Sequence, residues 1–202
     1  MYALYITHPQ VRIDPAIPVP RWGLSDAGRA RAEAAARQPW ARAIGRIVSS
    51  DEVKAVEMAA VLAAAAGIDV EIAEGAHEND RSATGFLPPP EFERAADWFF
   101  AHPEESFHGW ERAVDAQARI VSVVRSVLRD HDPAVPIAFV GHGGVGTLLR
   151  CHLAGLPIAR SHDQPPNGGG NIHAFRLADR KPLSGWVPME AWRGLADIRP
   201  VP

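Results

Sequence analysis

The chain has 202 residues, of which 47% are hydrophobic and 22% are charged, and its formal net charge is -3. This length and composition are typical of one globular domain, so we expect a single domain over residues 1–202. Because no excess of basic residues is present, the composition gives no support to nucleic acid or an anionic membrane surface as a partner.

Signals for export, membrane insertion and disulfide formation are missing from the sequence. Met1 leads directly into an apolar run, and no stretch approaches the roughly 18 to 20 consecutive apolar residues of a membrane span. We therefore expect a cytoplasmic protein. The one cysteine, Cys151, excludes an intrachain disulfide and a cysteine-rich zinc site, and we interpret it as a small buried hydrophobic residue.

The chain begins with an element of strand type and continues into a helix. Residues 2–6 are aromatic and aliphatic, and the run ends where a proline cannot donate the next ladder hydrogen bond. His8 therefore follows the carboxyl end of a strand. Prolines predict an extended surface loop over residues 13–22. Ser25 is a favourable N-cap, and the alanine-rich residues after it predict a helix over 27–37.

A second strand, over residues 44–48, leads into a helix that Gly67 ends. Ser49 and Glu52 have the spacing of a capping box at the start of this helix. Lys54 lies in the first turn, where a cation is mildly unfavourable. We expect its side chain either to face solvent or to meet an anion.

Apolar periodicity and the breaks between apolar runs indicate the remaining elements. We expect strands at residues 69–72, 137–140 and 172–177, an edge strand within 183–187, and helices at 91–100, 110–128 and 145–153. We interpret residues 79–110 as a helical, lid-type insertion with Phe86, Trp98 and Phe99 as lid residues. The glycine- and proline-rich loop over residues 163–171 is expected to help cover the same crevice.

Strands that alternate with helices predict a three-layer α/β/α domain with a mostly parallel central sheet. In such sheets, ligands bind beyond the carboxyl ends of the strands. Four segments follow predicted strand ends and should converge there, namely His8, residues 49–54, residues 78–81 and His142. The glycine-flanked His142 lies between a strand and a helix, and the unpaired N–H groups of a helix start suit an anion, phosphate first.

These residue types can carry out phosphoryl transfer. A neutral imidazole is a competent nucleophile toward phosphorus, and a second histidine can stabilise a phosphoryl oxygen. A cation can neutralise the charge that spreads over the transferring group, and a carboxylic acid can protonate the leaving alcohol. The histidine pair, the basic residues and the acidic loop of this chain contain each of these groups.

With these residues assembled, the chain resembles the histidine phosphatase superfamily, also called phosphoglycerate mutase-like. The family pattern is Arg-His-Gly after a first strand, a Leu-Ser/Thr helix start, a Ser-Ser-Pro-Leu-x-Arg-Ala segment, a glutamate, and a late His-Gly-Gly. The matching stretches occur in the same order and span most of the chain: Thr7-His8-Pro9, Leu24 to Ala32, Ser49 to Ala59, Glu78, and Gly141 to Val145. The resemblance implies the phosphoglycerate mutase-like fold.

The resemblance also implies roles for individual residues. His8 would be the nucleophile that becomes phosphohistidine, His142 would help to hold the phosphoryl group, and Glu78 would be the proton donor. Asp80 is a near alternative to Glu78 for proton donation. We expect the phosphate-binding residues around them to be Lys54, Arg81, Arg12, Gly143, Thr7 and Asp80.

The chain departs from the family pattern beside the nucleophile. Thr7 stands where the family has an arginine, Pro9 stands where it has a glycine, and Lys54 stands where it has a second arginine. Threonine cannot replace a planar, bidentate phosphate clamp, and lysine supplies only a point charge. Arg81 and Arg12 are the candidates to replace the lost charge.

Three hypotheses follow for function. The first is a phosphohydrolase that acts on a small phosphate ester through phosphohistidine, with no cofactor. The second is a catalytically weakened phosphate-binding or regulatory protein on the same fold, which the departures at Thr7, Pro9 and Lys54 suggest. The third is a metal-dependent hydrolase, whose scattered candidate ligands are His8, His77, Asp80, His142, His162 and Asp163. No tight metal-ligand spacing supports the third, so we expect no metal. Mutase activity is disfavoured because no long substrate-covering insert is recognisable.

Overall fold

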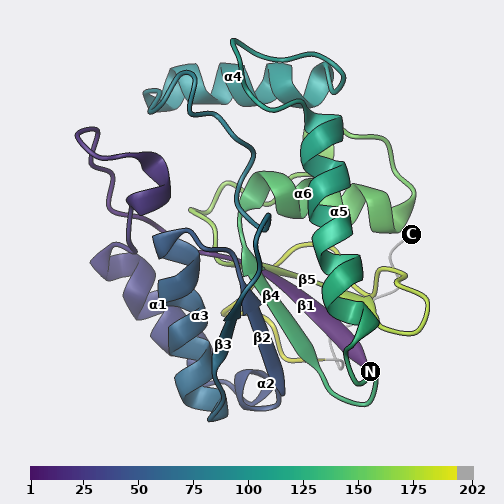
Figure 1. Ribbon diagram of the computed structural model, residues 1–202. Helices are drawn as coiled ribbons and strands as arrows, with labels where there is room; N and C mark the ends of the chain where they lie inside the picture. Colours follow the sequence, from purple (N-terminus) through teal and green to yellow (C-terminus); the bar gives the residue numbers. More distant parts are fainter. Residues whose placement is uncertain (195–202) are drawn as a thin grey trace.

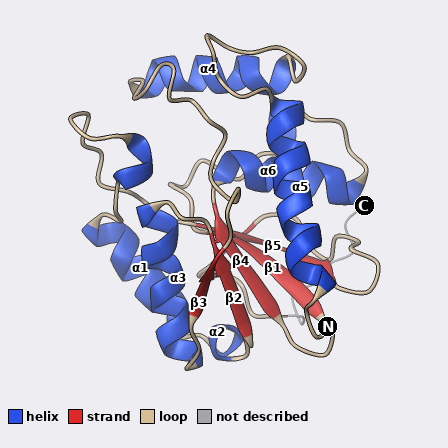
Figure 2. Ribbon diagram, in the orientation of Figure 1, coloured by secondary structure: helices blue, strands red, loops and turns tan. Residues whose placement is uncertain are grey.

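The computed structural model describes residues 1–194 and contains a central six-stranded sheet with helices on both faces (Figures 1 and 2). The order of the strands across the sheet is β3-β2-β4-β1-β5-β6. Their bounds are β1 (Tyr2–Thr7), β2 (Arg46–Ser49), β3 (Val70–Ile72), β4 (Ile137–Gly141), β5 (Asn171–Arg176) and β6 (Val187–Pro188). The first four strands in this order are mutually parallel, whereas β5 is antiparallel to β1 and β6 is antiparallel to β5. The predicted three-layer, mostly parallel α/β/α architecture is confirmed.

The helices separate into two layers and one outlying element. Their bounds are α1 (Asp26–Ala36), α2 (Pro39–Arg42), α3 (Val53–Ala66), α4 (Pro89–Ala101), α5 (Ala113–Arg129) and α6 (Gly143–Ala154), with short 3-10 helices η1 (Val19–Arg21) and η2 (Arg160–His162). In Figure 1, α1 and α3 cover one face of the sheet, α5 and α6 cover the other, and α4 lies beyond the sheet end at which β4 leads into α6. None of the helices within residues 1–194 combines the length and the apolar character needed to cross a membrane.

Strand β1 shows why the sheet needs both helical layers. Its side chains alternate between faces, so Leu4 and Ile6 join the core under α1 and α3, whereas Ala3 and Tyr5 join the core under α5 and α6. Every residue of β1 is therefore buried. A strand covered on both faces is a continuous apolar run rather than an alternating one, which is the pattern that the sequence has there.

The ends of two helices form as the sequence predicts. The Ser25 side chain caps α1 by accepting a hydrogen bond from the Gly28 N–H at 3.1 Å. Gly67 ends α3 in the left-handed conformation, with φ of 73°, which glycine adopts without steric cost. Between residues 1 and 177 the expected strands and long helices are present with bounds shifted by up to three residues.

Several local predictions are wrong. The capping box fails because Glu52 directs its carboxylate away from its own helix start, and Ser49 Oγ donates to the Ser50 carbonyl at 2.8 Å instead. The loop predicted to be extended over residues 13–22 contains the 3-10 helix η1. The short helix α2 was not expected, and it begins at a proline that suits a first helical turn. The edge strand within 183–187 is reduced to Val187–Pro188. Residues 195–202 of the predicted domain lie outside the described residues.

Strand register brings the predicted site segments together. Thr7 of β1 lies opposite Gly141 of β4, and Ser49 of β2 lies opposite Val140. The residues that follow these three strands therefore emerge side by side at one edge of the sheet. The His8 N–H donates to the Gly141 carbonyl at 3.0 Å, which fixes the chain just beyond β1.

His173 lies in the core of the α5 and α6 face without a hydrogen bond to its Nε2 atom from the described residues. Its ring stacks on Tyr5, with 5.3 Å between centroids, and contacts Trp186 edge-on at 4.7 Å. Burial, and then the charge of Arg150, lower the pKa of His173 to about 3. The ring is therefore neutral in the folded protein at pH values where it would be protonated in the unfolded chain.

This buried histidine should make the protein sensitive to acid. Between about pH 6.5 and pH 3, His173 binds a proton in the unfolded chain but not in the folded chain. The contribution of neutral His173 to stability is therefore complete above pH 6.5 and is lost as pH falls through this window. Between pH 7 and pH 5 the wild type should lose about 2 kcal/mol more unfolding free energy than a His173→Phe variant. Urea unfolding followed by circular dichroism measures this difference. A His102→Phe variant changes an exposed histidine and should keep the wild-type dependence; parallel curves for wild type and His173→Phe would refute the assignment.

Candidate active site

The two histidines predicted to form the site lie next to each other. The centroids of the His8 and His142 rings are 5.3 Å apart, and the ring planes are inclined by 70°. His8 Nδ1 is 2.8 Å from the Pro9 carbonyl oxygen. Because a carbonyl only accepts, Nδ1 carries the proton, and the lone pair is left on Nε2. Burial, followed by the neighbouring His142, lowers the pKa of His8 to about 3, so that at neutral pH Nε2 is available as a nucleophile.

His142 is fully buried at the N-cap of α6, and the structure fixes its position from two sides. The Tyr5 hydroxyl donates to the His142 carbonyl at 3.3 Å and accepts from the His142 N–H at 3.2 Å. The ring Nε2 lies 2.8 Å from Ser50 Oγ and 3.5 Å from Glu52 Oε1. Its Nδ1 has no hydrogen-bond partner within residues 1–194. Burial lowers the pKa of His142, opposed by the nearby carboxylates of Glu52 and Glu78.

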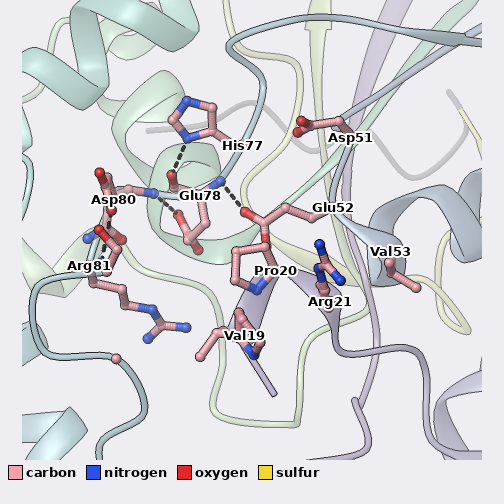
Figure 3. A pocket seen from close by; sticks show the side chains of 14 residues that line it. Val19, Pro20, Arg21, Asp51, Glu52, Val53, His77, Glu78, Asp80 and Arg81 are labelled. Atoms are coloured by element: carbon pink, nitrogen blue, oxygen red, sulfur yellow. Dashed lines mark hydrogen bonds between the residues drawn. The ribbon is translucent and has the colours of Figure 1, made fainter.

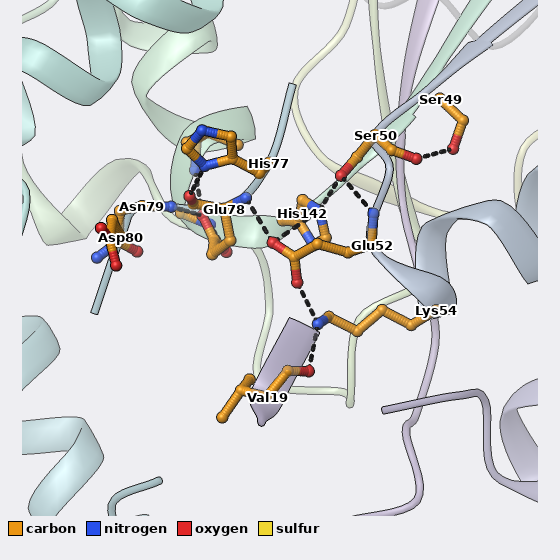
Figure 4. A network of polar contacts seen from close by, with 12 residues as sticks. Val19, Ser49, Ser50, Glu52, Lys54, His77, Glu78, Asn79, Asp80 and His142 are labelled. Atoms are coloured by element: carbon orange, nitrogen blue, oxygen red, sulfur yellow. Dashed lines mark hydrogen bonds and ion pairs between the residues drawn. The ribbon is translucent and has the colours of Figure 1, made fainter. Parts of the chain in front are cut away.

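Glu52 is the centre of a buried polar network beside His142 (Figure 4). Its carboxylate accepts a hydrogen bond from the Glu78 N–H at 2.9 Å and pairs closely with the Lys54 ammonium. Lys54 also donates to the Val19 carbonyl at 2.9 Å. Burial acts to raise the pKa of Glu52, but His142, Lys54 and the hydrogen bonds outweigh it and hold this pKa at about 2. Glu52 is therefore a permanent negative charge, and it already neutralises the lysine predicted to bind phosphate.

Glu78 occupies the start of α6. One carboxylate oxygen accepts from the Gly144 N–H at 3.0 Å, and the other accepts from the Val145 N–H at 2.9 Å. The sequence predicted that the helix start would face a phosphate, whereas these two N–H groups bind a side chain of the protein itself. In this structure the negative charge at the start of α6 is that of the Glu78 carboxylate.

Asp80, the alternative proton donor, has a different environment. Its side chain is exposed, and Oδ1 accepts a hydrogen bond from the Ser82 N–H at 2.9 Å. This backbone hydrogen bond lowers the pKa of Asp80 and holds it ionised in a turn. Of the two acidic candidates, Glu78 therefore has the closer connection to His142, because it binds the helix that His142 begins.

Thr7 belongs to a network on the other side of His8. Its Oγ1 donates to Gln164 Oε1 at 2.8 Å and accepts from the Asn171 N–H at 2.9 Å. Gln164 extends over the glycine turn, since a Cβ atom added to Gly143 would lie 2.3 Å from its Nε2. No hydrogen bond from this Nε2 is found in the described chain. Gln164 therefore places a free amide donor near the histidine pair.

The two arginines predicted as substitute clamps differ in position. Arg81 lines a cavity of about 790 Å³, and its guanidinium makes no hydrogen bond or ion pair with the described residues. Its Cζ lies 4.6 Å from the centroid of the Phe92 ring, and burial lowers its pKa. Arg12 is exposed, pairs with Asp26 at 3.6 Å and does not line the cavity. The expectation that Arg12 reaches the site is not supported by this geometry.

Figure 3 shows the side chains that line this cavity, among them Glu52, Glu78 and Arg81. Glu52 and Glu78 form its wall toward His142, and Arg21 of η1 and Arg81 supply its positive charges. Neither His8 nor His142 is among the residues that line it. Within residues 1–194 no group of three or more histidine, cysteine, aspartate or glutamate side chains is arranged to hold a metal ion.

Comparison with protein families agrees with this fold. Residues 17–182 match the histidine phosphatase superfamily (branch 1), which covers most of the chain. The chain therefore belongs to this superfamily, as the sequence motifs predicted. The match begins after His8 and so does not include Thr7-His8-Pro9. A search of curated protein sequences gave no significant match.

Solved structures with the same fold include phosphatases. Mycobacterial glucosyl-3-phosphoglycerate phosphatase in complex with inorganic phosphate superposes with a TM-score of 0.78, at 21% identity over 95% of this chain and 99% of that chain. The same enzyme complexed with VO3 gives a TM-score of 0.71 at 24% identity, covering 86% and 91% of the two chains. YhfR of Bacillus stearothermophilus gives 0.74 at 17% identity, covering 90% and 93%. At these identities the likeness shows the fold.

Sequence analysis assigned no individual role in the site to Glu52, Ser50, Gln164 or Arg21. One signal was present for Glu52, because it is a charged residue at the position where the family pattern has leucine. Its contacts with His142 and Glu78 join three segments far apart in the sequence. Gln164 lies in a loop that was predicted only as a cover, and nothing in its local sequence distinguishes it from other loop residues.

Removal of the Glu52 charge should strengthen anion binding. In a Glu52→Gln variant the Lys54 ammonium loses its partner, and an anion near His142 no longer meets a fixed negative charge. Calorimetric affinity for vanadate should increase at least about tenfold. Asp51→Asn is the matched control, because Asp51 is exposed on the same cavity and contacts neither residue, and it should change affinity much less. Equal effects of the two substitutions would show that only the overall charge of the cavity matters.

Proposed function

We propose that the chain is a phosphohydrolase that acts on a small phosphate ester through a phosphohistidine intermediate on His8. The observation that carries this proposal is the histidine pair, in which His8 presents an unprotonated Nε2 atom beside His142. Membership of the histidine phosphatase superfamily supports the same chemistry. The inorganic phosphate and VO3 complexes of the mycobacterial phosphatase are consistent with a phosphate-like oxyanion as ligand.

In the proposed first step, His8 Nε2 attacks phosphorus, a P–N bond forms, and the P–O bond to the alcohol breaks. His142, the Arg81 guanidinium and the free Gln164 amide are the donors available to the phosphoryl oxygens. In the second step, water attacks phosphorus, and the P–N bond breaks to regenerate His8 and release phosphate.

Glu78 is the proposed proton donor to the leaving alcohol and the acceptor of a proton from the attacking water. Both of its oxygens are engaged by the amides of Gly144 and Val145, so proton transfer requires one of these contacts to open. The backbone segment that would move continues directly into residues 79–110. We therefore also propose that this segment, with α4, acts as a lid on the crevice of the single domain.

A catalytically weakened, phosphate-binding or regulatory protein is the alternative. Two observations favour it. Thr7, in place of the arginine of the family pattern, is engaged by Gln164 and Asn171, and Lys54 is neutralised by Glu52. Neither residue supplies a bidentate clamp, which leaves Arg81 as the main free cation near the pair within the described chain.

The proposed nucleophile can be tested directly. His8→Ala should lower kcat for aryl phosphate hydrolysis by at least about a thousandfold, because no other group replaces the nucleophile. His152→Ala is the matched control, since His152 is an exposed histidine on α6, and it should retain activity. Both proteins are incubated briefly with a substrate that carries a labelled phosphate. An acid-labile label on the wild type that is absent from His8→Ala would identify the intermediate. Activity that survives His8→Ala excludes the proposal, and tight vanadate binding without turnover in the wild type favours the alternative.

A further inference from the structure

The cavity beside the histidine pair continues into a smaller crevice of about 180 Å³. The two spaces share Val19, Arg81 and Gly85 in their linings. The crevice lies between the loop that carries η1 and the segment that leads into α4. The crevice therefore offers further space, next to the cavity, for part of a ligand.

The crevice is built mainly from apolar and aromatic side chains, namely Ile13, Trp22, Phe86, Leu87, Pro89 and Phe92. The rings of Trp22 and Phe86 pack against each other in its lining, with 5.5 Å between centroids and planes inclined by 60°. Trp22 is held in place because its Nε1 donates to the Asp14 carbonyl at 2.9 Å and to the Ile17 carbonyl at 3.2 Å. These two contacts fix the Trp22 ring. The charged side chains in the lining of the crevice are those of Arg81 and of Glu93, which pairs with Arg160.

Exposed hydrophobic residues surround the same opening. Ile13 is 54% exposed at the crevice, and Val53 is 38% exposed at the cavity. Contact of these apolar side chains with water is unfavourable in free energy, and a bound apolar ligand would remove this contact. Pro18, Val19 and Pro20 extend this apolar wall into the larger cavity.

The charges of the cavity limit how many anionic groups a ligand can carry. Asp51, Glu52, Glu78 and Asp80 line it, whereas its cations are Arg21 and Arg81. A phosphate that engages Arg81 leaves only the exposed Arg21 among the cations that line the cavity, since Lys54 is paired with Glu52. A second phosphate or a carboxylate on the ligand would face the acidic side chains.

From this geometry we propose that the substrate is the phosphate monoester of an apolar alcohol, whose hydrocarbon part occupies the Trp22–Phe86 crevice and which carries no second anionic group. The proposal rests on the phosphohydrolase function proposed above, and it adds the chemical class of the alcohol. Arg81 connects the two parts of the site, because it lines both spaces and its guanidinium carbon Cζ lies 4.6 Å from the centroid of the Phe92 ring in the crevice.

Non-hydrolysable phosphonates test this specificity independently of turnover. We expect calorimetry on the full chain to show hexylphosphonate binding at least about tenfold tighter than methylphosphonate, from burial of methylene groups in the crevice. Hexylphosphonate with a carboxylate at the far end of the chain should lose most of this gain. Phe86→Ala should reduce the hexyl-to-methyl preference at least about threefold and leave methylphosphonate affinity unchanged. Ile72→Ala, at a 53% exposed isoleucine of the edge strand β3, is the matched control and should leave the preference unchanged.

Equal affinities for methyl- and hexylphosphonate would overturn the proposal, as would a preference for the carboxylate-bearing ligand or a hexyl preference that persists in Phe86→Ala. Absence of binding by any phosphonate would also overturn it. These outcomes are distinct from failure of the phosphohydrolase function, which appears as selective phosphonate binding without His8-dependent turnover. Normal His8-dependent turnover with no chain-length preference would reject only the apolar substrate class.

Discussion

The buried carboxylate of Glu52 is the interaction on which the arrangement of the site depends. It lies 3.5 Å from the His142 ring, pairs with Lys54 and accepts the Glu78 N–H at 2.9 Å. Three segments that follow different strands are thereby joined through one charged group. A buried ion is tolerable only when it is paired and hydrogen-bonded, so these partners cannot be separated without cost. The network holds Glu78 in reach of the start of α6.

The site has more internal negative charge than a simple phosphate pocket requires. Glu78 binds the helix N–H groups, and Glu52 binds the lysine, so two features that attract phosphate elsewhere are satisfied by the protein. The groups left free are neutral His8, the Gln164 amide and the Arg81 guanidinium. Because few groups remain free, the same site is compatible both with phosphoryl transfer and with weakened anion binding. The division of charge also restricts the number of negative charges that a ligand can carry.

Most of the fold could be predicted because it depends on local periodicity. The apolar run of β1, the Ser25 cap and the Gly67 end of α3 each follow from residues within a few positions of one another. The predictions that failed involve competition between local and distant partners. Glu52 has the spacing of a capping residue, but its carboxylate meets stronger partners in Lys54 and the Glu78 N–H, which no local pattern reveals.

The sequence by itself determined the mostly parallel α/β/α architecture and the histidine pair, because strand ends and a glycine turn can be recognised from short runs of consecutive residues. Only the tertiary structure decided which charges remain free. Lys54, Arg12 and Arg81 were all candidate phosphate-binding cations in the sequence, but folding pairs Lys54 with Glu52 and Arg12 with Asp26. Arg81 alone of the three lines the cavity unpaired among the described residues. Ion pairing depends on distances of a few ångströms between segments remote in the chain, and such distances exist only once the strands are in register.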